Sequence, residues 1–148
     1  RMYFEDSLPK AIRFATRYGV MCGFETMETA FMDTVEKAMA YINRIASPYL
    51  GVYPDLGNLT NAARQYGHDL YADLACGYGH IVAMHLKETA PGIYRDLNYG
   101  KGHVDFQEGI RAAQTLGVMR FVTEFWHDGR ENWIGRLYDT ASFFQALK

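Results

Sequence analysis

Four short apolar stretches of the sequence each end at a side chain that can bind a metal ion. These side chains are Glu25, Asp55, His85 and Glu124, which follow one another at intervals of about 30 to 40 residues. Carboxylates combined with one imidazole suit Mn²⁺, Mg²⁺ or Co²⁺, and they can accommodate Zn²⁺. If the fold brings the four side chains together, they form a divalent metal site, and such a site suggests an enzyme.

The apolar stretches have the length of buried strands, and a helical pattern follows each of them. We expect strands at residues 19–24, 49–53, 81–86 and 120–123. We expect helices at residues 7–18, 29–45, about 62–76, 105–116 and 133–146. Ser7 is expected to cap the first helix, with Pro9 in its first turn, and residues 58–61 are expected to be loop or cap.

This alternation predicts an α/β fold in which parallel strands are joined by right-handed helical crossovers. Because the carboxyl ends of parallel strands meet on one rim, residues far apart in sequence can meet there. Four βα units are half of a TIM (β/α)8 barrel, so we expect residues 1–148 to be a single domain with the fold of a parallel (βα)4 half-barrel. A small open α/β sandwich is the rival fold, and it gives no reason for every strand to end at an acid or a histidine.

A free half-barrel exposes two strand edges, which is a liability for a protein in solution. We therefore expect either a homo-oligomer or pairing with a missing N-terminal half. The chain begins at Arg1 and not at an initiating Met, which agrees with the loss of an N-terminal portion.

Each rim residue also has a simpler interpretation. Polar residues collect where strands meet loops, and a carboxylate at a strand end is a common helix cap. For any one of the four, a cap is as plausible as a metal ligand. For all four together the metal site is favoured, because no rim position in the series is apolar.

Four further residues are candidates for binding substrate: Asn58, Lys87, Arg95 and Trp126. Asn58 can return to the rim because Pro54 and Gly57 shape the chain before it, or it can cap a helix. Lys87 follows His85 by two residues and can share its face, or it can lie in solvent. Arg95 is a candidate clamp for a phosphate or carboxylate, or a solvated loop residue.

Trp126 follows the fourth strand, where barrels often bind phosphate, and it can form a wall of the pocket. Arg130 in the same loop can contact a phosphate. The alternative for this segment is a surface loop with one anchoring aromatic side chain.

Composition excludes several classes of protein. A hydrophobic content of 49% rules out a disordered chain, and a net charge of −2 with scattered Lys and Arg argues against a nucleic-acid partner. No apolar run approaches the roughly 20 residues of a membrane span, so no membrane partner is expected. With only two cysteines, Cys22 and Cys76, a reduced cytoplasmic protein is the natural expectation.

Several motifs resemble the C-terminal half of the L-ribulose-5-phosphate 3-epimerases (also called L-xylulose-5-phosphate 3-epimerases), a family of the xylose-isomerase-like barrel superfamily. The matching stretches are Ser47-Pro48, residues 53–58, His85-Leu86-Lys87-Glu88-Thr89, Pro91-Gly92, Tyr94-Arg95, residues 100–106 and Thr123-Glu124-Phe125-Trp126. The resemblance covers nearly all 148 residues, and the cluster around His85 together with Val104-Asp105-Phe106 is fairly specific to the family.

The resemblance implies a divalent metal ion held by Glu25, Asp55, His85 and Glu124, with a ketopentose phosphate as substrate. The metal would polarise the C2 carbonyl and stabilise an enediolate. Glu25 and Glu124 would flank C3, one removing its proton and the other returning a proton to the opposite face. The sequence departs from the family because it lacks the first half of the barrel, which would supply one wall of the substrate pocket. The resemblance therefore implies metal binding by this chain, but it does not imply turnover by this chain alone.

Three other functions compete with the epimerase. A metal-dependent phosphodiesterase of the apurinic-endonuclease type would need more histidines and a basic face for DNA. A non-catalytic half-barrel would keep the fold and the metal without turnover. A related 1,2-isomerase of the same superfamily would differ only in its product.

Overall fold

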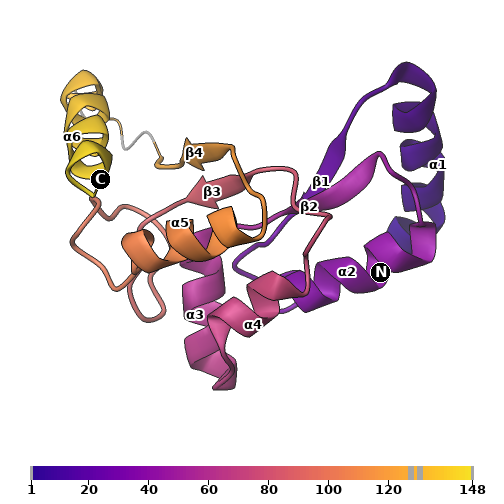
Figure 1. The fold of residues 1–148 in the computed structure, drawn as a ribbon, viewed down its shortest axis with the longest axis horizontal. Helices are drawn as coiled ribbons and strands as arrows, with labels where there is room; N and C mark the ends of the chain where they lie inside the picture. Colours follow the sequence, from indigo (N-terminus) through magenta and orange to yellow (C-terminus); the bar gives the residue numbers. More distant parts are fainter. Residues whose placement is uncertain (1, 127–128, 130–131, 148) are drawn as a thin grey trace.

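The computed structural model describes residues 2–126, 129 and 132–147. Its elements alternate along the chain as predicted (Figure 1). They are α1 (Met2–Tyr18), β1 (Cys22–Glu25), α2 (Val35–Ile45), β2 (Leu50–Tyr53), α3 (Leu56–Tyr66), α4 (Leu70–Ala75), β3 (Met84–Leu86), α5 (Phe106–Thr115), β4 (Phe121–Thr123) and α6 (Trp133–Ala146).

The strands form two parallel pairs, β1 with β2 and β3 with β4. Parallel bridges between Val52 and Ile81 and between Asp55 and His85 join β2 to β3, so the spatial order is β1-β2-β3-β4. In this register Glu25 lies beside Tyr53, and His85 lies beside Val122. The predicted α/β arrangement of four parallel βα units is therefore confirmed.

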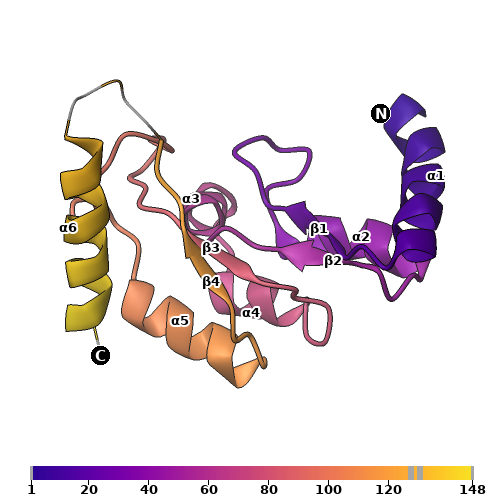
Figure 2. The ribbon, with the colours of Figure 1, turned by 90° about the horizontal axis from the view of Figure 1, so that it is seen from above.

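Helices α2 to α5 run along one side of the strands, while α1 and α6 stand at the two ends (Figures 1 and 2). The core lies between these helices and the outward-facing strand side chains. Its fully buried members include Val35, Ile42, Val52, Leu56, Leu59, Leu74 and Met84. Burial of these apolar side chains stabilises the fold by about 25 cal/mol per Å² of buried area. It fixes which face of each strand packs against the helices and which face is turned away from them.

Capping of the helix ends explains where the structure differs from the predicted helix boundaries. The helix expected from residue 29 begins at Val35, because Thr34 caps it and the Asp73 carboxylate accepts the N–H groups of Val35 and Glu36. Residues 58–61 are not a loop, since Asp55 caps α3 three residues earlier. The helix expected to continue to residue 76 breaks into α3 and α4 at Gly67, whose φ is +66°.

The prediction that Ser7 caps the first helix was wrong. Helix α1 begins at Met2 and contains Pro9 in its interior. Phe4 packs its ring against Phe31 and Tyr41, with centroids 5.4 Å apart in both pairs. These aromatic contacts stabilise the extra turn before Ser7, which no local sequence signal announced.

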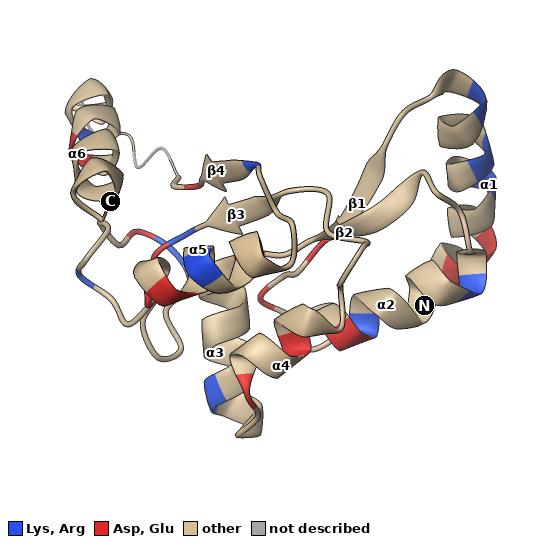
Figure 3. Ribbon diagram, viewed as in Figure 1, with Lys and Arg blue, Asp and Glu red and all other residues tan. Residues whose placement is uncertain are grey.

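Charged residues are spread over the chain (Figure 3). Several Lys and Arg lie on α1, while α2 and α5 carry both signs of charge, and no single described element gathers all the positive charge. No helix among the described residues is long and apolar enough to cross a membrane.

Candidate metal centre

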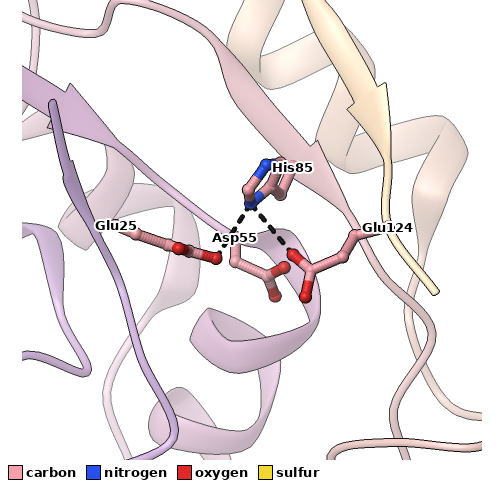
Figure 4. A group of neighbouring side chains, drawn as sticks. All are labelled: Glu25, Asp55, His85 and Glu124. Carbon is pink, nitrogen blue, oxygen red and sulfur yellow. Dashed lines mark hydrogen bonds and ion pairs between the residues drawn. The ribbon is translucent and has the colours of Figure 1, made fainter. Parts of the chain in front are cut away.

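The four predicted rim residues converge at the carboxyl ends of the strands (Figure 4). One ligand atom from each of Glu25, Asp55, His85 and Glu124 lies within 4.8 Å of the others. Glu25 is the last residue of β1, His85 lies within β3, and Glu124 directly follows β4. Among the described residues, this is the one group of at least three acids, histidines and cysteines with such geometry.

His85 presents a single ring nitrogen to two carboxylates. Its Nδ1 hydrogen-bonds Glu25 Oε1 at 3.0 Å, while Glu124 Oε2 lies 3.0 Å away without hydrogen-bond geometry. The ring is held from one side by Tyr53, whose centroid is 4.2 Å from that of the imidazole. Since Nδ1 carries at most one proton, it cannot satisfy both acids, and a cation shared by all three groups would.

Asp55 is fully buried and divides its two oxygens between two tasks. Oδ1 accepts the N–H of Asn58 at 2.7 Å and so caps α3. Oδ2 is buried with no hydrogen-bond partner and lies 3.5 Å from the amine of Lys87. The capping and metal-ligand interpretations of this residue are thus both supported, one by each oxygen.

The backbone of Asp55 is fixed from the preceding loop. Its N–H donates to the hydroxyl of Thr26 at 2.8 Å, and the side-chain amide of Asn58 donates to the carbonyl of Thr26 at 2.8 Å. All three residues are buried. Thr26 was not among the predicted site residues, and its only signal in the sequence is its position directly after Glu25.

The electrostatics of the cluster follow from burial and proximity. Burial raises the pKa of Asp55 to about 7, although Lys87 opposes the shift. The contact with His85 lowers the pKa of Glu124 to about 2, with Lys87 acting in the same direction. Burial by itself would lower the pKa of His85, but the carboxylates of Glu124 and Glu25 raise it overall.

Of the predicted substrate-binding residues, Asn58 and Lys87 belong to the cluster itself. Asn58 lies inside α3, where it ties Thr26 to Asp55 and does not cap the helix. Lys87 is not a solvated loop residue, since its side chain is 7% exposed. Its amine lies 3.5 Å from Asp55 Oδ2 and 3.6 Å from Glu124 Oε1, so it contributes a positive charge between two acids.

Arg95 and Trp126 meet across loops on the rim. The Arg95 guanidinium is paired with Glu28 and lies 4.4 Å from the centroid of the Trp126 ring. Both Arg95 and Trp126 are about half exposed. Arg130 lies outside the described residues.

The donor set fits a divalent cation. Three carboxylates and one imidazole provide oxygen-rich coordination, and Asp55 Oδ2 and Glu124 Oε2 are buried without hydrogen-bond partners. An unpaired buried carboxylate oxygen is costly, which makes a cation the natural partner for this cluster. With a 2+ ion and Lys87, the charges of the three carboxylates would be balanced.

Comparison with known proteins identifies the class. The family model of the xylose isomerase-like TIM barrel matches residues 1–147, and the chain belongs to this family. The chain is 32% identical over 133 residues to the L-ribulose-5-phosphate 3-epimerase UlaE of Shigella boydii and to that of Salmonella typhimurium, matching 89% of this chain and 45% of each relative. It therefore spans about half the length of the curated relatives it matches.

Solved structures agree on the fold. A D-tagatose 3-epimerase-like protein superposes with a TM-score of 0.74 at 19% identity, over 96% of this chain and 52% of that one. An L-ribulose 3-epimerase superposes with a TM-score of 0.70 at 16% identity, over 95% of this chain and 51% of that one.

Proposed function

We propose that this chain is the metal-binding half of a sugar-phosphate 3-epimerase that interconverts L-ribulose 5-phosphate and L-xylulose 5-phosphate. The observation that carries the proposal is the convergence of Glu25, Asp55, His85 and Glu124 within 4.8 Å. The 32% identity to relatives named L-ribulose-5-phosphate 3-epimerase supports the choice of substrate. In this proposal residues 1–148 are a single domain equivalent to the C-terminal half of a barrel.

The four residues would hold a divalent ion such as Mn²⁺, Mg²⁺, Co²⁺ or Zn²⁺, which when bound supplies Lewis-acid polarisation of the ketose carbonyl. Glu25 and Glu124 enter from β1 and from the end of β4, the two outer strands of the set, so their carboxylates approach the cluster from opposite sides (Figure 4). One glutamate removes the C3 proton to give an enediolate, and the other returns a proton to the opposite face.

Of the remaining predicted residues, Lys87, Arg95 and Trp126 would contact the rest of the substrate. Lys87 lies where it can donate to a sugar oxygen beside Asp55 and Glu124. Arg95, backed by the Trp126 ring, is our candidate for the phosphate, because a guanidinium donates two parallel hydrogen bonds to it. Asn58 acts through Thr26 and Asp55.

The test is proton exchange at C3. L-Ribulose 5-phosphate is incubated with the chain in D₂O in a Mg²⁺ buffer free of paramagnetic Mn²⁺ and followed by NMR, with Glu25→Gln and Glu124→Gln as variants. We expect the C3 proton signal to disappear, and either variant to slow the exchange by about 100-fold or more. Exchange at C1 with an aldose product would indicate a 1,2-isomerase.

The alternative is a half-barrel that retains the metal without turnover. It is favoured by the fact that the chain corresponds to 45% of its relatives. Mg²⁺ binding with no exchange at C3 would support this alternative and contradict the epimerase for the chain alone. We also propose that the open strand edges pair, either with a second copy of the chain or with a separate N-terminal half.

A further inference from the structure

The hydroxyl of Tyr99 lies at the end of the β3–β4 ladder, close to two backbone carbonyl groups. Its hydroxyl lies 2.5 Å from the carbonyl oxygen of Leu86 and 3.0 Å from the carbonyl oxygen of Glu124. The last backbone bond of this ladder joins the N–H of Glu124 to the same Leu86 carbonyl at 2.9 Å. The phenol thus supplies a donor at the point where the regular backbone pairing stops.

This arrangement fixes Glu124 at both backbone polar groups. Its N–H donates to the Leu86 carbonyl, and its own carbonyl shares the single proton of the Tyr99 hydroxyl with that Leu86 carbonyl. With both groups held, the direction in which the Glu124 side chain leaves the backbone is set before any ligand arrives. Glu124 directly follows the short strand β4, so without Tyr99 its carbonyl would lack this partner.

The phenol is itself held firmly. Its ring packs among the rings of Phe106, Phe143 and Phe144, with centroids 5.3, 5.8 and 5.0 Å away. These rings come from α5 and α6, so both helices contribute to the position of the hydroxyl.

The loop that carries Tyr99 is anchored by a buried carboxylate. Glu88 Oε2 accepts the N–H of Gly100 at 2.8 Å, and Glu88 Oε1 accepts those of Thr89 and Val104 at 3.1 and 3.3 Å. Gly102 packs directly on this carboxylate, where an added Cβ would lie 2.4 Å from Glu88 Oε1. Glu88 is 3% exposed, so these three bonds are its principal role in the described structure.

We propose that Tyr99, anchored through Glu88, is a positioning residue that orients Glu124 for metal binding. The proposal rests on the metal centre of the proposed function. It assigns to the loop at residues 88–104 a task in preorganising the centre, in addition to any contact with substrate. Partners that orient metal ligands in this way typically contribute 10- to 100-fold in metal affinity.

The experiment measures the dissociation constant of Mn²⁺ alone for the full chain by competition with a fluorescent chelator. Tyr99→Phe keeps the ring and removes only the hydroxyl, and we expect it to weaken Mn²⁺ binding by about tenfold. Tyr138→Phe is the matched control, because that tyrosine is 72% exposed on α6, and its affinity should equal that of the wild type. Circular dichroism and thermal melting, recorded without metal, report the fold of each variant.

Three outcomes are distinguishable. A folded Tyr99→Phe variant that binds Mn²⁺ within twofold of the wild type overturns the positioning role and leaves the metal centre intact. A wild-type chain that binds no Mn²⁺ overturns the metal centre of the proposed function and the inference together. If Tyr99→Phe does not fold, Glu88→Gln carries the test, with weakened Mn²⁺ affinity supporting the proposal and unchanged affinity overturning it.

Discussion

At the residue scale, Asp55 combines a structural and a chemical task in one carboxylate. Its folded-state pKa of about 7 lies well above the value near 3.9 of an unfolded aspartate. The native state therefore holds the Asp55 proton more tightly than the unfolded state does. In the metal-free protein, the stability from this group is fully present below pH 4 and is lost as the pH rises through about 7.

We expect Asp55→Asn to stabilise the metal-free protein at pH 8 by up to about 4 kcal/mol and to have little effect at pH 4. Asparagine keeps an oxygen that can accept the Asn58 N–H, so the cap of α3 should survive. Urea unfolding in the presence of EDTA at both pH values measures the difference. Asp105→Asn changes an exposed cap of α5 in the same way and should show no pH-dependent gain; a gain there as large as that at Asp55 would contradict the explanation.

The protonation of Asp55 and His85 determines how the metal affinity of the proposed centre depends on pH. Asp55 and His85 must both be unprotonated to bind a cation. Burial raises the pKa of Asp55, and the carboxylates of Glu124 and Glu25 raise the pKa of His85 against the effect of burial. Each proton released on binding makes the Mn²⁺ dissociation constant fall by about tenfold when the pH rises by one unit. We expect this dependence between about pH 6 and 7. Chelator competition at pH 6, 7 and 8 tests this, and an affinity independent of pH would show that Asp55 is not a ligand.

At the element scale, the close approach of β2 and β3 depends on a glycine. A Cβ at Gly51 would lie 2.3 Å from the backbone carbonyl oxygen of His80, which cannot move without shifting the chain before β3. Asp55 and His85 follow on these two segments, so spreading them would also separate two ligands of the cluster.

We expect Gly51→Ala to lower the free energy of unfolding by about 1–3 kcal/mol. Gly109→Ala is the comparison, since the Cβ there meets movable side-chain atoms of Leu56 and alanine favours the helix α5. Chemical denaturation should therefore show a smaller loss for Gly109→Ala. Equal losses for the two variants would contradict the importance of the β2–β3 approach.

The element boundaries show which parts of the fold the sequence could predict. The bounds of α5 and α6 were predicted to within one residue, because both helices depend on local signals. The start of α2 was wrong, because the Asp73 carboxylate that binds its first N–H groups comes from α4. Contacts between elements distant in sequence leave no mark in a local pattern.

At the scale of the whole molecule, the two ends of the strand order are open. Within the described residues β1 pairs only with β2, and β4 pairs only with β3. Val122 in β4 is 46% exposed on the face that carries His85. Exposed edges of this kind are templates for pairing with another chain.

We expect the purified chain to associate into dimers, measured as mass by light scattering after size-exclusion chromatography. Val122→Lys places a charge on the open edge and should shift the chain toward the monomer without removing a metal ligand. A stable, soluble wild-type monomer would contradict the pairing of the edges.

By itself, the sequence determined the βα alternation and the four metal-competent residues, because strand ends and helix patterns are local and the parallel fold brings those ends to one rim. For Lys87 the sequence left two positions open, the face of His85 or solvent. Only the tertiary structure decided the rest: that Asp55 divides its oxygens between a cap and the cluster, that Thr26 fixes its backbone, and that Tyr99 holds Glu124. These roles depend on burial and on contacts across loops, whose geometry exists only when the chain is packed.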